Sequence, residues 1–167
     1  MAEPSGRLRV MVDANVLFAA TLWPRWPYDV IAHAQKGDFQ LVLAPVVIDA
    51  ARDAMATRFP QAVERFESLL RLVRYEEVPD TSATHVARNR DLVRDVTDVP
   101  VALAAIQARV DYFVTEDKDF TDEAATTFEV RQRLNIMRPV IFLREVMGWT
   151  SEELERVRKR TWRDLEP

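Results

Sequence analysis

The stretch LRVMVDANVL, residues 8–17, decides the fold. Its first five residues, Leu8 to Val12, form a short Val-rich apolar run that stops at Asp13, which is typical of a buried strand followed by a polar turn. From Asn15 to Leu22 the apolar residues recur at helical spacing. The stretch therefore predicts a strand, a turn and a helix in direct succession, the unit from which α/β proteins are built.

The same unit recurs along the chain. Residues 39–44 (FQLVLA) predict a second buried strand, and Pro45 opens a helix whose apolar residues share one face. Residues 99–108 (VPVALAAIQA) predict a strongly apolar helix that leads into a third strand at 111–115 (DYFVT). The further elements expected are helices over 27–37 and from Pro60 to Val73, a short strand up to Val78, a partly helical segment 80–94, a helix over 121–134, a short strand at 135–137, and helices over 140–147 and from Thr150. The alternation predicts an α/β fold, a three-layer sandwich with a mostly parallel central sheet and helices on both faces.

Length and composition narrow the class of protein. The 167 residues predict a single domain, 1–167, in which 151–167 form a C-terminal helical extension. The absence of Cys excludes thiolate metal sites and a cysteine nucleophile, and only 3 Gly argue against a Gly-rich phosphate loop. A net charge of −4 argues against coating of nucleic acid by bulk attraction. Because no apolar run approaches the ~20 residues of a membrane span, we expect a cytoplasmic enzyme or binding protein without membrane contact.

Acidic residues fall where the predicted strands end. Asp13 follows the first strand directly, and Asp117 lies two residues beyond Thr115 at the end of the third. Asp95 and Asp98 precede the helix that leads into that third strand. Because open α/β sheets bind ligands at the carboxyl ends of their strands, these carboxylates are expected to converge there. They would repel one another without a cation, so the pattern predicts a site for Mg²⁺ or Mn²⁺.

Each acid also has a more ordinary interpretation. A single Asp after a strand is more commonly a turn former or a helix cap, and Asp98 and Asp119 suit that role. Acids at two separate strand ends, together with Asp98, favour the metal site. An Asp that ends a strand also serves phosphoaspartate chemistry, but residues 13–15 (DAN) lack the second Asp of such a nucleophile motif.

Three segments resemble the PIN domain family. Residues 12–17 (VDANVL) resemble its opening, in which an Asp ends the first strand and an Asn follows two residues later. Residues 95–120 resemble its second signature, an Asp heading an apolar helix and then a strand that ends in Thr-x-Asp. Residues 136–143 are similar to its closing strand and Pro-x-x-Phe-Leu turn. The resemblance covers about residues 8–147 and is carried by the order and spacing of the motifs.

The resemblance implies metal-dependent endonucleolytic cleavage of RNA, by a protein that can be the toxin of a toxin–antitoxin pair. The carboxylates implied as catalytic and metal-binding are Asp13, Asp98 and Asp117. The residues implied to orient or flank them are Asn15, Thr115, Asp95 and Asp119. The cofactor implied is Mg²⁺ or Mn²⁺, and the partners implied are the RNA substrate, an antitoxin protein and a second copy of the chain in a homodimer.

One departure from the family concerns the helix after the second strand. The family usually carries a Glu where this chain has Ala50. At ~100° per residue, Asp49 lies about 100° around the helix from Ala50, whereas Asp53 lies about 60° away and one turn along. Asp53 is therefore the better substitute as a metal ligand. The missing Glu also keeps a second function open, a catalytically impaired PIN-like module that binds RNA or protein without cleavage.

Basic residues near the acids are candidates for RNA contacts. Arg88, Arg90 and Arg94 lead directly into the acidic segment and are predicted to contact the RNA backbone. A second basic run is interleaved with Glu and is expected to be a solvated helix face; it comprises Arg156, Arg158, Lys159, Arg160 and Arg163. For Trp23 and Trp26, core or dimer packing is expected rather than base stacking.

Overall fold

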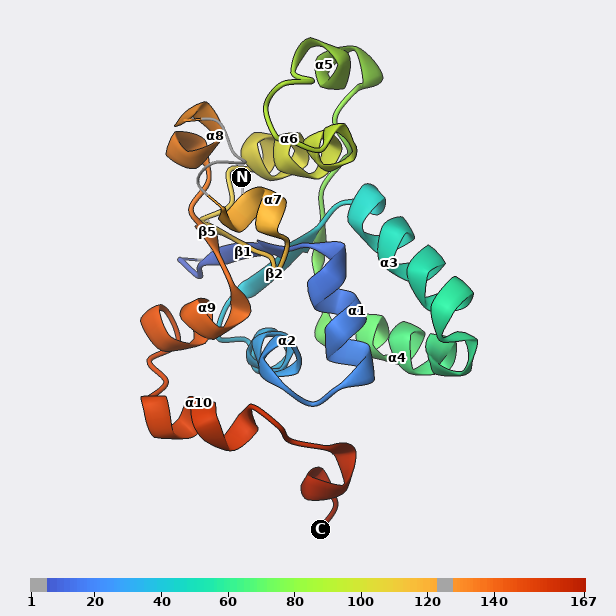
Figure 1. Ribbon diagram of the computed structural model, residues 1–167, viewed down its shortest axis with the longest axis vertical. Coiled ribbons are helices and arrows are strands. Elements are labelled where there is room, and N and C mark those ends of the chain that lie inside the picture. Colours follow the sequence, from blue (N-terminus) through green and yellow to red (C-terminus); the bar gives the residue numbers. More distant parts are fainter. Residues whose placement is uncertain (1–5, 123–127) are drawn as a thin grey trace.

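The computed structural model describes residues 6–122 and 128–167 (Figure 1). Within them lies one parallel sheet whose strand order is β3-β2-β1-β4-β5. The strands are β1 (Arg9–Val12), β2 (Gln40–Leu43), β3 (Glu76–Glu77), β4 (Tyr112–Val114) and β5 (Ile136–Met137).

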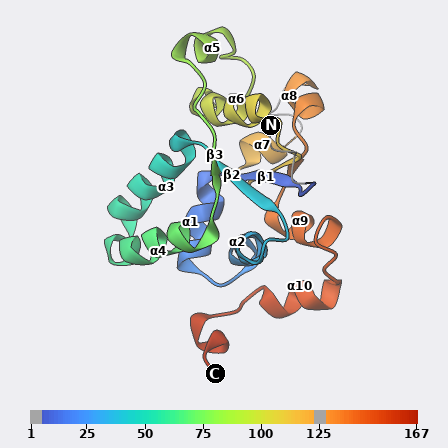
Figure 2. The ribbon, with the colours of Figure 1, turned by 180° about the vertical axis from the view of Figure 1, so that it is seen from behind.

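Helices cover both faces of this sheet (Figures 1 and 2). They are α1 (Ala14–Leu22), α2 (Trp26–Lys36), α3 (Pro45–Arg58), α4 (Val63–Val73), α5 (Ala83–Arg88), α6 (Val99–Ala108), α7 (Lys118–Thr121), α8 (Phe128–Arg133), α9 (Pro139–Glu145) and α10 (Ser151–Val157), with 3-10 turns η1 (Pro60–Ala62), η2 (Val96–Asp98) and η3 (Trp162–Leu165). In Figure 1, α6 lies on one side of the sheet and α1 and α2 lie on the other. The predicted three-layer α/β sandwich is confirmed, and its described strands all run parallel.

The pattern of apolar residues follows from these positions. β1 is the central strand, and Val10, Met11 and Val12 are fully buried, because helices cover both of its faces. A strand buried on two faces is a continuous apolar run rather than an alternating one. Pro stands in the first turn of α2, α3, α6 and α9, where its missing N–H has no partner to lose.

Two expected helices differ from the structure. The helix expected over 121–134 is wrong at its start, because α7 begins earlier, capped by Asp117, and ends at Thr121. Helix α8 begins at Phe128, and residues 123–127 of the expected helix lie outside the described ones. The helix expected from Pro60 opens as the 3-10 turn η1 and becomes α-helical only at Val63. Across the described ranges, no helix has both the length and the apolar character needed to cross a membrane.

The C-terminal segment 151–167 packs along α2 and the turn before it. Trp26 Nε1 donates to the Leu154 carbonyl at 3.0 Å, so this Trp serves packing. Arg160 donates to the Pro24 carbonyl at 2.6 Å and forms a largely buried ion pair with Asp29 at 2.7 Å. The rest of the predicted basic run is exposed, with Arg156 and Arg158 paired to acids of the same helix, which confirms the solvated face for those residues.

The strand order decides where a ligand can sit. From β1 the chain builds β2 and β3 on one side and then returns to build β4 and β5 on the other. The carboxyl ends of β1 and β4 therefore meet at the point where the strand order reverses, the usual ligand position in open α/β sheets. The register pairs Val12 with Val114, which brings Asp13 and Thr115 side by side.

Candidate active site

Asp13 is held by hydrogen bonds at the end of β1. It caps α1, with Oδ1 accepting from the Ala14 N–H at 2.8 Å, while Oδ2 accepts from the Thr115 hydroxyl at 2.9 Å. The residue is only 8% exposed. Burial raises the pKa of the Asp13 carboxyl, the hydrogen bonds from Thr115 and Ala14 oppose that rise, and the charge of Asp117 adds to it. The side chain is thus both a helix cap and an acid poised at the strand end.

Asn15 and Thr115 fix the position of this carboxylate. The Thr115 hydroxyl donates to Asp13 and accepts from the Asn15 side-chain amide at 3.2 Å and from the Asp117 N–H at 3.0 Å, which uses its full bonding capacity. Asn15 Oδ1 in turn accepts from the Glu116 N–H at 3.1 Å. These bonds tie the start of α1 to the loop after β4, the geometry required of the orienting role implied for both residues.

Asp98 is the centre of the acidic cluster. It stands at the N-cap position of α6 but makes no capping hydrogen bond, unlike the ordinary cap that the sequence also allowed. Its Oδ2 is buried and, within the described residues, has no hydrogen-bond partner. Burial raises the pKa of Asp98 to about 7, with further contributions from the charges of Asp117, Asp13, Asp95 and Asp119, in that order. The charges of the acids at the two strand ends therefore act on Asp98 at the head of α6.

Asp95 and Asp119 lie closer to the centre than the sequence suggested. One carboxylate oxygen from each of Asp95, Asp98 and Asp119 lies within 4.8 Å of the others. Asp95 Oδ1 accepts from the N–H and the hydroxyl of Thr97 at 2.9 and 2.7 Å. Asp119 is paired with the Arg94 guanidinium. The two residues expected at the margin therefore share one acidic group with Asp98.

The donor set suits a hard divalent cation. Every group in it is a carboxylate, the ligand that Mg²⁺ and Mn²⁺ prefer. Asp117 is outside the group that Asp95, Asp98 and Asp119 form, but its charge acts on Asp98, and at the head of α7 its Oδ1 accepts from the Asp119 N–H at 2.9 Å. The buried Asp98 Oδ2 has no donor from the described protein groups, so a cation would supply the missing charge. The residues present therefore fit Mg²⁺ or Mn²⁺.

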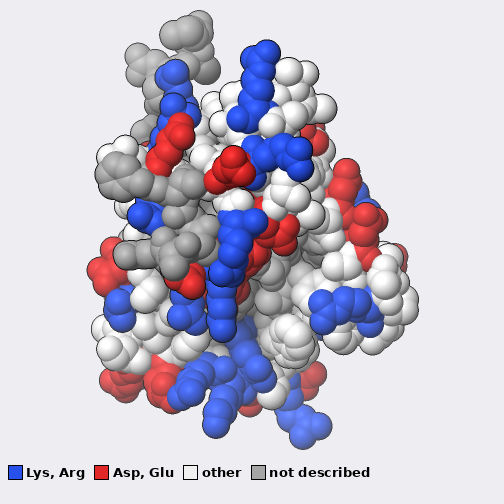
Figure 3. All heavy atoms as spheres, turned by 45° about the horizontal axis from the view of Figure 1, so that its top comes forward, with Lys and Arg blue, Asp and Glu red and all other residues white. Residues whose placement is uncertain are grey.

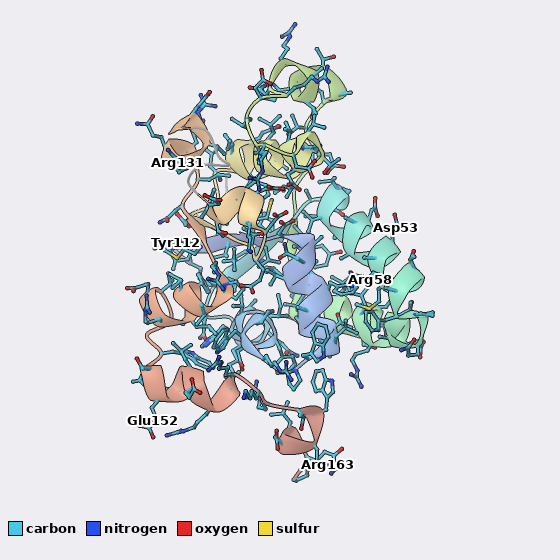
Figure 4. The ribbon with its side chains drawn as sticks, in the orientation of Figure 1. Asp53, Arg58, Tyr112, Arg131, Glu152 and Arg163 are labelled. Carbon is cyan, nitrogen blue, oxygen red and sulfur yellow. The ribbon has the colours of Figure 1, made fainter. Side chains whose placement is uncertain are left out.

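The structure does not bring Asp53 into this group. Asp53 is exposed on α3 and points away from the body of the molecule (Figure 4), and it is not part of the group that Asp95, Asp98 and Asp119 form. Asp49, the alternative, is also exposed and lies 3.6 Å from the Arg52 guanidinium. Helix α3 turns both side chains to solvent, so neither takes the place left by Ala50.

Arg88, Arg90 and Arg94 lie beside the acids. Together with Asp91 they line a hollow of about 450 Å³ next to η2. Figure 3 shows basic side chains next to acidic ones over the end of the molecule that carries α5 and α6. The pairing of Arg94 with Asp119 was not foreseen, although the order Arg94-Asp95 in the sequence placed a base next to the acids.

Glu116 is a further acid that the sequence analysis did not single out. Burial raises the pKa of its carboxyl, and the charge of Arg138, whose guanidinium lies 3.9 Å away, opposes that rise. The only available signal was its place between Thr115 and Asp117. Its backbone N–H, which binds Asn15, is the part of this residue that supports the site.

Two solved structures share this fold. The Pyrobaculum aerophilum protein PAE2754 superposes with a TM-score of 0.57 at 16% sequence identity, covering 85% of this chain and 98% of that one. VapBC2 from Rickettsia felis, solved bound to a DNA fragment from its promoter, superposes with a TM-score of 0.55 at 14% identity, covering 78% of this chain and 98% of that one. At these identities the likeness establishes the fold alone. No curated protein matches the sequence.

The sequence itself carries the family assignment. A sequence model described as the PIN domain matches residues 9–119, which include both strand ends and every carboxylate of the cluster. That range is more than half of the chain, and it agrees with the sheet order and the site described above. The chain therefore belongs to the PIN domain family.

Proposed function

We propose that this protein is a metal-dependent endoribonuclease that hydrolyses RNA phosphodiester bonds. The observation that carries the proposal is the convergence of acids from β1, β4 and α6 around Asp98, whose buried Oδ2 has no hydrogen-bond partner among the described residues. Membership of a family composed largely of nucleases supports the same reaction class.

Asp13, Asp98 and Asp117 would hold one or two Mg²⁺ or Mn²⁺ ions, and Asp95 and Asp119, which share a group with Asp98, would complete the set. A bound ion of this kind supplies a water of lowered pKa and stabilises the charge that develops on a phosphodiester. The protein holds Asp13 through the Thr115 hydroxyl and Asn15, so the ligand does not have to be ordered when the ion binds. Arg88, Arg90 and Arg94 would contact the RNA backbone beside the acids.

Calorimetric titration of Mn²⁺ and Mg²⁺, followed by cleavage of unstructured RNA, tests this proposal. Asp13→Asn and Asp117→Asn are expected to lose metal binding and cleavage together, while circular dichroism shows an intact fold. Asp53→Asn is the matched control, an equivalent change on an exposed α3 side chain, and should behave as the wild type. Cleavage retained by both Asp13→Asn and Asp117→Asn would refute the site.

A second function rests on Ala50. Helix α3 presents no acid in the place where the family usually has a Glu, and Ala50 itself is exposed. This favours a protein that binds RNA or a protein partner without cleavage. The two functions separate in one assay, because the binding module would retain RNA in the presence of Mn²⁺ without shortening it.

The partners and the domain organisation are part of the same proposal. The likeness to the VapBC2 complex supports an antitoxin partner, and co-purification from the native host tests it. Homodimer formation and a cytoplasmic location stay predictions, the first of which sedimentation analysis checks. The hydrogen bonds from Arg160 and Trp162 to the α1–α2 region support one domain, 1–167, with 151–167 as an extension packed on it.

A further inference from the structure

We propose that a hollow between α3, α5 and α6 is a binding site for one unpaired nucleobase of the substrate RNA. The inference rests on the proposed function, because it adds a subsite for the RNA that would reach the carboxylates. The hollow is an open depression of the surface with a volume of about 530 Å³.

The lining of this hollow is mostly apolar. Val46 comes from α3, Ala83 and Val86 from α5, Val96 from η2 and Pro100 from α6. Val96 is 47% exposed, so its side chain is accessible from this hollow. These side chains form an apolar surface on which a nucleobase can pack and release the water from its faces. Such packing binds an RNA strand with little dependence on its sequence.

A few polar groups lie at the edge of the same hollow. Asp80 and Thr81 also line it, and Asp80 Oδ1 already accepts from the Val46 N–H at 2.9 Å. Arg90 contributes the basic group. Such groups can bind the polar edge of a base while the apolar side chains contact its faces.

The neighbouring hollow supplies the positive charge that a nucleotide also needs. Its lining includes Arg88, Arg90 and Arg94, of which Arg94 is paired with Asp119, and one acid, Asp91. The two hollows share Ala87, Arg90 and Val96 in their walls. Within residues 6–122 and 128–167, no carboxylate oxygen lies within 4.0 Å of the Arg88 or Arg90 guanidinium. Guanidinium groups without an acidic partner beside an apolar hollow match the phosphate and the base of one nucleotide. An apolar peptide would leave these charges without a partner.

The position of the hollow links it to the site of cleavage. Val96 forms part of both walls and lies between Asp95 and Asp98 in η2. An RNA strand that places a base in the apolar hollow and a phosphate on the arginines therefore continues along η2 to the carboxylates. In an A-form duplex the bases are stacked and paired, so only an unpaired base can enter.

The test fills the hollow without touching the acids. Ala83 is exposed at the start of α5 and lines the apolar hollow but not the basic one, so Ala83→Leu narrows the former alone. The control is Ala56→Leu, the same change at an exposed position of α3. The probe is a short unstructured fluorescein-labelled RNA, bound to the full chain in EDTA and followed by anisotropy.

We expect Ala83→Leu to weaken binding of this RNA about tenfold, the effect of losing one base contact, and Ala56→Leu to bind as the wild type. The same RNA with abasic sugars should bind the wild type as weakly as intact RNA binds Ala83→Leu, and the two losses should not add. The abasic probe needs no variant, so it decides the question even where Ala83→Leu misfolds. Equal binding of intact and abasic RNA, or equal affinity for duplex RNA, overturns the inference, and so does a wild type that binds no RNA.

Failure of the inference and failure of the nuclease are separate results. Metal-dependent cleavage that Ala83→Leu leaves unchanged would overturn the base site and leave the nuclease standing. RNA binding that depends on the hollow, without cleavage in Mn²⁺, would support the base site and refute the nuclease. A single-stranded DNA of the same sequence shows whether the hollow distinguishes the sugar.

Discussion

Replacing Asp98 by Asn should stabilise the protein in the absence of metal and remove its stabilisation by Mn²⁺. Asp98 makes no capping hydrogen bond at the head of α6, and its Oδ2 has no partner among the described groups. Asn has nearly the same shape and no charge. The substitution therefore removes an unfavourable charge while giving up no hydrogen bond that the structure shows.

The size of the effect follows from the surroundings of the carboxylate. Burial and the neighbouring acids raise the pKa of Asp98 from its ordinary 3.8 to about 7. At about 1.36 kcal/mol for each pH unit between these values, the ionised group destabilises the fold by at most about 4 kcal/mol. The side chain is only half-buried, and solvent screening reduces this to about 2 kcal/mol. For a chain of this length the corresponding rise in Tm is about 4 to 8 °C.

The higher stability of Asp98→Asn relative to the wild type should appear only as the pH rises. Below about pH 4 the group is protonated in the folded and the unfolded chain, so the variant and the wild type are equally stable. As the pH rises toward 7, the unfolded wild type releases its proton first while the folded wild type keeps it. The folded wild type therefore loses stability relative to Asp98→Asn up to about pH 7, and the difference is constant above that value.

Urea unfolding in EDTA at about pH 5, 6.5 and 8 measures this difference, with Asp53→Asn as the control that should match the wild type at each pH. Adding Mn²⁺ at pH 8 should then reverse the order, because an ion that binds only the folded state stabilises the wild type and not Asp98→Asn. An Asp98→Asn protein no more stable than the wild type at pH 8 in EDTA would refute the electrostatic reasoning. Equal stabilisation of both proteins by Mn²⁺ would refute the ligand assignment.

Two further substitutions test the supports of the site and the extension. Thr115→Val keeps the shape of a fully buried side chain but removes the hydroxyl that binds Asp13, so the free energy of unfolding should fall by about 1 to 3 kcal/mol, measured in urea, with Mn²⁺ affinity lowered about 10- to 100-fold by calorimetry. Arg160→Met leaves Asp29 buried without its partner and should lower stability by about 3 kcal/mol, whereas Arg156→Met, at an exposed pair in α10, should change it by less than about 0.5 kcal/mol. Equal effects of the two Arg variants would contradict a structural role for the extension.

Most of the fold was predictable because its signals are local. A Val-rich run that stops at Asp13 predicts a buried strand from adjacent residues alone, and Pro45 and Pro139 mark helix starts through their own fixed geometry. The larger of the two exceptions is the expected helix over 121–134. There the Asp117 side chain caps a short helix three residues earlier than the apolar spacing indicated.

For the candidate site, too, some features were predictable from the sequence and others were not. The sequence by itself determined which acids follow strands and precede α6, and hence that Asp13, Asp98 and Asp117 were candidates. Only the tertiary structure decided that Asp119 shares a group with Asp98 and binds Arg94, and that Asp53 faces solvent. The physical reason is that strand order, crossover and register set distances between residues far apart in the chain, whereas composition and periodicity report only on neighbours within a few residues.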